Sequence, residues 1–162
     1  MRRLAYLMPL VLVATVGTAG LADRAEAAMC AMPSERAGFD TRVLQTELMV
    51  AALTCGERSR YNSFARKFRA ELVANGKALR QYFRRVHGKR GDAETSRFVT
   101  RLANEASARS LVNGTEVYCA SASSLFSQVL GLESADLQAY VARRPPQVDH
   151  GMETCPRETT SD

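Results

Sequence analysis

Residues 61–86 of the 162-residue chain read YNSFARKFRAELVANGKALRQYFRRV, and this stretch decides the expected fold. Its apolar residues recur at the three- and four-residue intervals that place side chains on one face of an α-helix. The pair Asn75-Gly76 is typical of a helix end. Leu72 and Leu79 nevertheless stay on the same face across this pair, so the stretch predicts a single helix, straight or kinked, over about residues 62–87. The apolar face consists of Tyr61, Ala65, Phe68, Leu72, Leu79, Phe83 and Val86.

Helical periodicity also dominates the sequence on both sides of this stretch. An apolar stripe precedes it, with Asp40 or Thr41 as the expected helix N-cap. Further stripes follow it and are separated by turns rich in Gly and Pro. No segment alternates polar and apolar residues as a half-buried strand would. The sequence therefore predicts an all-α fold, a disulfide-tied bundle of four or five helices. The expected helices span about residues 41–56, 62–87, 92–112, 115–130 and 134–143.

The N-terminal residues have the organisation of a secretory signal peptide. Arg2 and Arg3 precede an apolar run, and Ala25-Glu26-Ala27 fits the small-x-small cleavage pattern. Cleavage after Ala27 would release a periplasmic or secreted protein with a net charge of +4. Two alternatives remain open, namely a retained membrane anchor and lipidation of Cys30. The expected organisation is a signal peptide (1–27), an extended segment (28–39), a helical domain (40–144) and a polar tail (145–162), which we expect to be loose except where Cys155 fixes it.

All four cysteines lie beyond the expected cleavage site. An even number of cysteines in an oxidising compartment is typical of disulfides, and four cysteines allow three pairings. We favour Cys55–Cys119, because both residues lie within expected helices, together with Cys30–Cys155, because both lie in the irregular ends. The chain has no Cys-x-x-Cys motif, so neither a thioredoxin-like redox site nor a paired zinc knuckle is indicated.

With this spacing of helices and cysteines, the chain resembles a group of small exported proteobacterial proteins of unknown function. The resemblance covers about residues 40–130. It implies a periplasmic or secreted location, and it brings no activity and no catalytic residues. The residues that carry it are Leu44, Glu47-Leu48-Met49, Ala52-Leu53, Cys55-Gly56, Tyr61-Asn62, Phe64, Asn75-Gly76 and Cys119.

A basic stripe on the central helix is the strongest functional feature of the sequence. Residues 58–90 contain eleven Lys or Arg residues and a single acid, Glu71. The stripe lies about 110° around the helix from the apolar face. It consists of Arg66, Arg69, Lys77, Arg80 and Arg84.

The basic stripe favours a non-enzymatic protein that binds an anionic envelope component or an acidic protein partner. Nucleic acid fits the charge but not an exported protein. The alternative interpretation is a solvated face that is partly neutralised by acids of other helices, such as Glu94 and Glu105.

Catalytic and metal-binding chemistry has little support in the sequence. The chain contains two histidines, of which His87 is expected at a helix end, where the helix dipole favours a cation, and His150 lies in the tail. We predict no metal, no cofactor and no catalytic constellation. Two other function classes stay open: a stress-protective periplasmic chaperone, and an enzyme whose site is assembled only by the fold, for example from His87 and a carboxylate. The aromatic residues of the central helix are expected in the core: Tyr61, Phe64, Phe68, Tyr82 and Phe83.

Overall fold

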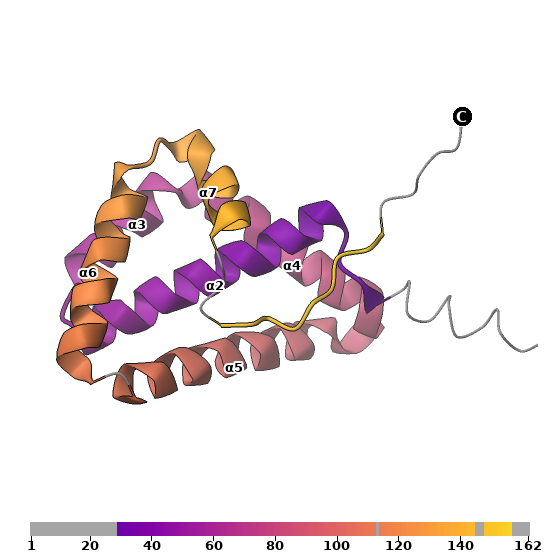
Figure 1. Ribbon diagram of the computed structural model, residues 1–162. Helices are drawn as coiled ribbons and strands as arrows, with labels where there is room; N and C mark the ends of the chain where they lie inside the picture. The colour runs from indigo at the N-terminus through magenta and orange to yellow at the C-terminus, as the bar shows by residue number, and fades with distance from the viewer. Residues whose placement is uncertain (1–28, 113, 145–147, 157–162) are drawn as a thin grey trace, which may run out of the picture.

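The computed structural model describes residues 29–112, 114–144 and 148–156 and confirms the all-α, disulfide-tied bundle (Figure 1). The expected pairs Cys30–Cys155 and Cys55–Cys119 are both formed. The expected signal peptide lies outside the described residues. In chain order the elements are α2 (Pro33–Thr54), α3 (Arg58–Lys67), α4 (Arg69–His87), the 3-10 helix η1 (Gly88–Arg90), α5 (Gly91–Val112), α6 (Thr115–Gly131), the 3-10 helix η2 (Ser134–Asp136) and α7 (Leu137–Arg143).

Helix α2 is the central element, because every other α-helix of the described chain packs against it. In Figure 1 it crosses the middle of the molecule, with α6 at one end and α4 towards the other. Its C-terminal half packs with α3, α6 and α7 around a first core, which contains Leu48, Phe64, Phe68, Phe126 and Leu137. Its N-terminal half packs with α4 and α5 around a second core, which contains Phe39, Leu79, Tyr82, Phe83 and Phe98.

The start of α2 corrects the expectation of an extended segment over residues 28–39. The helix begins at Pro33, a residue whose fixed φ angle suits the first turn of a helix. The carboxylate of Glu35 accepts a hydrogen bond from the backbone N–H of Met32 at 2.9 Å and so satisfies one free donor of that turn. Asp40, an expected N-cap, therefore lies inside the helix, next to the fully buried Phe39.

The single helix expected over residues 62–87 is also corrected, because the structure divides this stretch into two helices at Phe68. Helix α3 ends at Lys67 and α4 begins at Arg69, whereas Gly76 lies within α4 as its phase predicted. Phe68 is buried in the first core and Leu79 is buried in the second core. The stretch thus contributes to both cores: Leu72, in the first turn of α4, still packs against the first core, and the later turns of α4 face the second.

A close approach between α2 and α4 holds the second core together. A Cβ atom on Gly38 would lie 2.8 Å from the backbone oxygen of Asn75 and 3.1 Å from the backbone nitrogen of Leu79. Real Cβ atoms essentially never lie within 3.0 Å of a backbone atom, so the contact with Asn75 permits only glycine at this separation of the two backbones.

The C-terminal segment is docked along the bundle, although it was expected to be loose except near Cys155. In Figure 1 the yellow chain runs between α2 and α5. Val148 is buried in the second core. Ala31 donates its N–H to Glu153 O at 2.8 Å, and Cys155 donates its N–H to Ala31 O at 2.9 Å. Residues 145–147 and 157–162 of the expected tail lie outside the described residues.

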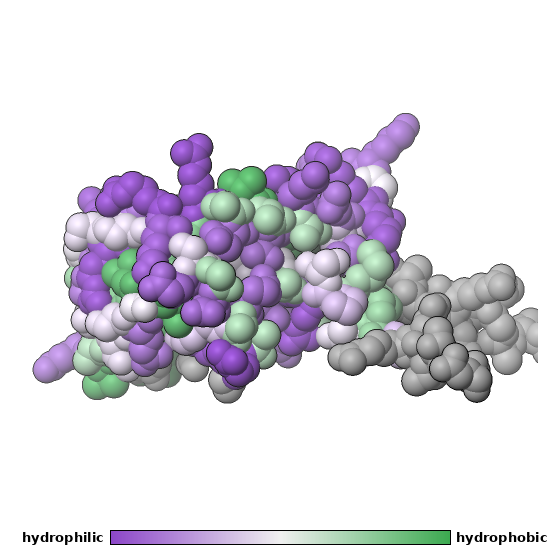
Figure 2. Space-filling view, turned by 90° about the horizontal axis from the view of Figure 1, so that it is seen from above, coloured by the Kyte–Doolittle hydropathy of each residue, from purple (hydrophilic) through white to green (hydrophobic). Residues whose placement is uncertain are grey.

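The surface seen from above in Figure 2 is mostly hydrophilic, and its apolar residues lie in small groups between charged ones. In the described part of the chain, no helix contains an apolar stretch long enough to cross a bilayer. The two disulfides are compatible with a protein outside the cytoplasm, where thiols become oxidised.

Candidate functional site

The five residues of the predicted basic stripe are all exposed, but they do not form one continuous row. Because the helix is interrupted at Phe68, Arg66 lies on α3 and the other four residues lie on α4. Arg66 donates a hydrogen bond to the hydroxyl of Ser63. Lys77, Arg80 and Arg84 are spaced at three and four residues and share one face of α4.

Arg84 is neutralised, by an acid other than those expected. Its guanidinium donates to both oxygens of Asp92 on α5 at 3.0 Å, and this hydrogen-bonded pair lowers the pKa of Asp92. The acids expected to neutralise the stripe, Glu94 and Glu105, instead pair with Arg97 and Arg101 of their own helix. The expectation that Glu94 and Glu105 neutralise the stripe was therefore wrong, because arginines three and four residues away on the same helix pair with these two carboxylates.

Arg80 is the member of the stripe that lies close to an arginine of another helix. Arg42 of α2 approaches it over Gly76: Arg42 Nη2 and Arg80 Nη1 lie 3.6 Å and 3.8 Å from the point where a Gly76 side chain would begin. Neither guanidinium forms a hydrogen bond or an ion pair with any residue that the structure describes.

The half-buried position of Arg42 makes its charge costly. Burial lowers the pKa of Arg42; Tyr61 opposes this shift, and Arg80 adds to it. The sequence analysis did not select Arg42, because it lies on α2 and outside the basic stripe. Two like charges that meet without an acid are the arrangement that an anion stabilises.

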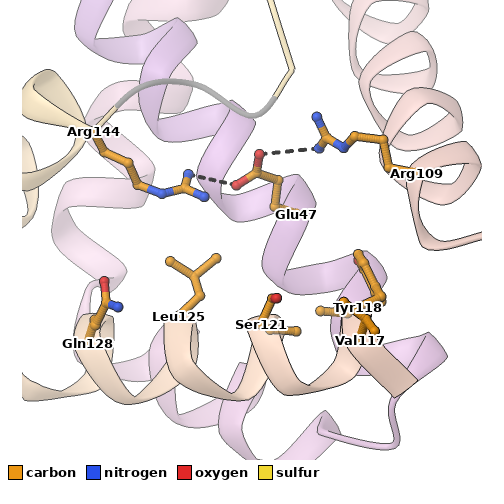
Figure 3. Close-up of a pocket in the computed structure, with 10 residues that line it drawn as sticks. Glu47, Arg109, Val117, Tyr118, Ser121, Leu125, Gln128 and Arg144 are labelled. Carbon is orange, nitrogen blue, oxygen red and sulfur yellow. Dashed lines mark hydrogen bonds and ion pairs between the residues drawn. The ribbon is translucent and has the colours of Figure 1, made fainter. Parts of the chain in front are cut away.

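A second site surrounds Glu47, a carboxylate on the core face of α2. Its side chain is only 7% exposed. Arg109 of α5 donates to Oε1 at 3.3 Å, and Arg144, directly after α7, donates to Oε2 at 2.7 Å. Figure 3 shows the two arginines reaching Glu47 from opposite sides.

The Glu47 site opens into a pocket of about 360 Å³. Helix α6 forms the facing wall, from which Ser121, Leu125 and Gln128 point towards Glu47 (Figure 3). Tyr118 also lines the pocket, and burial raises the pKa of its phenol; Arg109 opposes this shift and Glu47 adds to it. A signal for this site was present in the sequence, because Glu47 falls on the apolar stripe of Leu44 and Leu48, where a charge needs partners.

His150, which was assigned to the loose tail, is a buried structural residue. Its side chain is 2% exposed, and its ring lies against Phe39. Nδ1 accepts the Met152 N–H at 3.0 Å, which leaves the proton on Nε2 to be donated to Asp40 Oδ1 at 3.1 Å. No sequence periodicity reveals such a contact.

His87 lies at the end of α4, as expected, and its ring stacks on Phe83 at 6.0 Å. Among the described residues, no three His, Cys, Asp or Glu side chains are grouped to hold a metal ion. No protein-family model, curated protein or solved structure matches the chain.

Proposed function

We propose that the protein is a non-enzymatic, periplasmic or secreted binding protein that holds anionic phosphate groups of an envelope component on the exposed face of α4. The observation that carries this proposal is the meeting of Arg42 and Arg80 over Gly76 without an acidic partner in the described chain. Lys77 extends the same face by one helical turn.

The chemistry of the pair favours phosphate. A guanidinium presents planar N–H donors that match the oxygens of a phosphate, and charge-assisted hydrogen bonds are about twice as strong as neutral ones. An anion between Arg42 and Arg80 would also offset their mutual repulsion and the burial of Arg42. Both groups lie close to one point above Gly76, because an added Cβ atom there would be in ordinary van der Waals contact with each of them.

Binding to lipid vesicles tests the proposal. We expect the protein to bind vesicles that contain phosphatidylglycerol, to ignore vesicles of phosphatidylcholine alone, and to be released as salt rises from about 0.05 M to about 0.5 M. Replacing Arg42 and Arg80 by Gln should weaken binding at least about tenfold. The pair Lys77→Gln and Arg80→Gln provides a second test that leaves the half-buried Arg42 unchanged.

The matched control is the pair Arg97→Gln and Arg143→Gln, which removes the same charge from exposed positions on α5 and α7. If the control weakens binding equally, net charge alone explains the attraction and the proposed site is wrong. Binding to polyglutamate but not to the vesicles would assign the face to an acidic protein partner.

A chaperone is the second candidate, favoured by apolar side chains beside the connection of α5 and α6. Leu111 and Val112 are 80% and 84% exposed, and Val117 is exposed on the next helix. A chaperone should suppress light scattering by a heat-denatured client protein, and Leu111→Ser with Val112→Ser should abolish the protection. Val73→Ser, at an exposed apolar position on α4, is the control. A wild-type protein that protects no client would exclude this function.

A further inference from the structure

We infer that the Glu47 pocket is a second ligand site, which takes a small amphipathic carboxylic acid: a carboxylate head with a short apolar tail. The site is independent of the α4 face, because its walls are built by α2, α5, α6 and the residue after α7.

The pocket has the size and the lining of a small-molecule site. Its volume of about 360 Å³ lies at the lower end of the range of about 300–1,000 Å³ that is common for ligand pockets. Ala51, Ala122 and Leu125 supply apolar contact surface, whereas Ser121 and Gln128 supply hydrogen-bonding groups. A ligand that satisfies both sets must itself have a polar end and an apolar end.

The charges around the pocket select the sign of the polar end. Glu47 is the only acidic residue among the described residues that line the pocket, and it faces two arginines, which leaves a net charge of +1. The Glu47 side chain is 7% exposed, whereas those of Arg109 and Arg144 are 29% and 18% exposed. The arginine side chains are therefore more exposed to solvent than the carboxylate between them.

Each arginine also keeps unused donors. A guanidinium carries five N–H donors, and the described bonds to Glu47 use one donor of Arg109 and one of Arg144. Glu47 thus fixes the two guanidiniums in place while their remaining N–H groups are free to bind an incoming carboxylate. Pre-organised donors of this kind lose little conformational entropy on binding.

Octanoate and 1-octanol are the probes that separate head-group recognition from apolar filling. They share a tail and differ in the carboxylate. We expect one octanoate to bind per protein in a calorimetric titration, at least about tenfold more tightly than 1-octanol, because the alcohol forfeits charge-assisted hydrogen bonds. Equal affinities for the two probes, or no binding of octanoate, would overturn the inference.

Two variants with matched controls locate the binding. Ser121→Trp places a large ring at an exposed position of the pocket wall and should abolish octanoate binding, whereas Ala120→Trp, at the adjacent exposed position outside the lining, should not. Arg109→Gln should reduce the preference for octanoate over 1-octanol, and Arg101→Gln on the same helix should leave it unchanged. Circular dichroism would verify that each variant is folded. If Arg109→Gln fails to fold, the comparison of Ser121→Trp with Ala120→Trp tests the site alone. Equal octanoate binding by these two variants would then refute the site.

Discussion

His150 and Asp40 lie 110 residues apart in the sequence, yet His150 Nε2 is 3.1 Å from Asp40 Oδ1 inside the protein. Asp40 also accepts a hydrogen bond from Arg36 at 3.2 Å, and Arg101 of α5 donates a hydrogen bond to the backbone oxygen of His150 at 3.1 Å. The C-terminal segment is therefore attached to both α2 and α5 through one buried imidazole and its backbone.

We expect His150→Ala to lower the free energy of unfolding by about 2–4 kcal/mol, because it leaves a cavity and removes hydrogen bonds on both ring nitrogens. Urea denaturation followed by circular dichroism measures the change. His87→Ala removes an incompletely buried ring that stacks on Phe83 and should cost less than about 1.5 kcal/mol. Equal losses for the two variants would contradict the structural role of His150.

Gly38→Ala should destabilise the protein by about 1–3 kcal/mol, because the added methyl group would force the backbones of α2 and α4 apart at Asn75. Gly131→Ala is the control: outside its own stretch of helix no described atom lies within 4 Å of the added carbon, and alanine favours helix over glycine by about 1 kcal/mol. Thermal unfolding of both variants should shift the midpoint in opposite directions. A neutral Gly38→Ala would show that the two helices can separate without cost.

The free energy of unfolding should fall as the pH rises above about 10, the ordinary pKa of the tyrosine side chain. Burial raises the pKa of Tyr82, Tyr118 and Tyr140. When the pH exceeds the pKa of tyrosine in the unfolded chain, the unfolded chain loses protons that the folded chain retains. Unfolding therefore becomes more favourable as the pH rises. For Tyr82 the physical reason is direct, because its hydroxyl donates to Met29 O at 2.6 Å and an ionised phenolate cannot.

Tyrosinate absorbance measures this effect. The folded protein should titrate at higher pH than the protein in concentrated urea, and the midpoint of thermal unfolding should drop between about pH 9 and about pH 11. Replacing Tyr82 by Phe should reduce the difference between the folded and the unfolded titration. Coincident titrations would show that the three phenols are not protected by the fold.

Each disulfide closes a long loop, so the loss of either should be costly. Cys55–Cys119 and Cys30–Cys155 span 64 and 125 residues, and the chain-entropy model gives a contribution of about 4–5 kcal/mol for each, without simple additivity. Urea unfolding of the paired Cys→Ser variants tests this expectation. A loss below about 1 kcal/mol would indicate that the unfolded chain stays compact without the bridge.

The sequence revealed the elements better than their packing. Helical spacing predicted α5 and α6 to within a residue or two, because their ends carry Gly and Asn. The break at Phe68 was missed because spacing along one helix does not tell which core each turn will face. The same limit hid the start of α2, where Pro33 and Glu35 form a helix start inside a segment of weak periodicity.

The candidate sites show the same division. Arg80 was selected from its charge and spacing alone. Its partner Arg42 comes from another helix, and only the packing of α2 against α4 brings the two side chains together over Gly76. Glu47 was readable as a charge on an apolar stripe, but its partners Arg109 and Arg144 are 62 and 97 residues away, and only the packing of α5 and α7 against α2 supplies them.

The link between Cys30 and Cys155 has a mechanical consequence. Tension applied to the chain outside these two residues passes directly across the sulfur–sulfur bond, so the helices between them carry none of the load. Reduction of this bond exposes the helices to the force, except for residues 56–118, which the Cys55–Cys119 bond still bypasses. The helices of the oxidised protein should therefore not unfold when the chain is pulled from its two ends, whereas the protein with both disulfides reduced should unfold under the same pull.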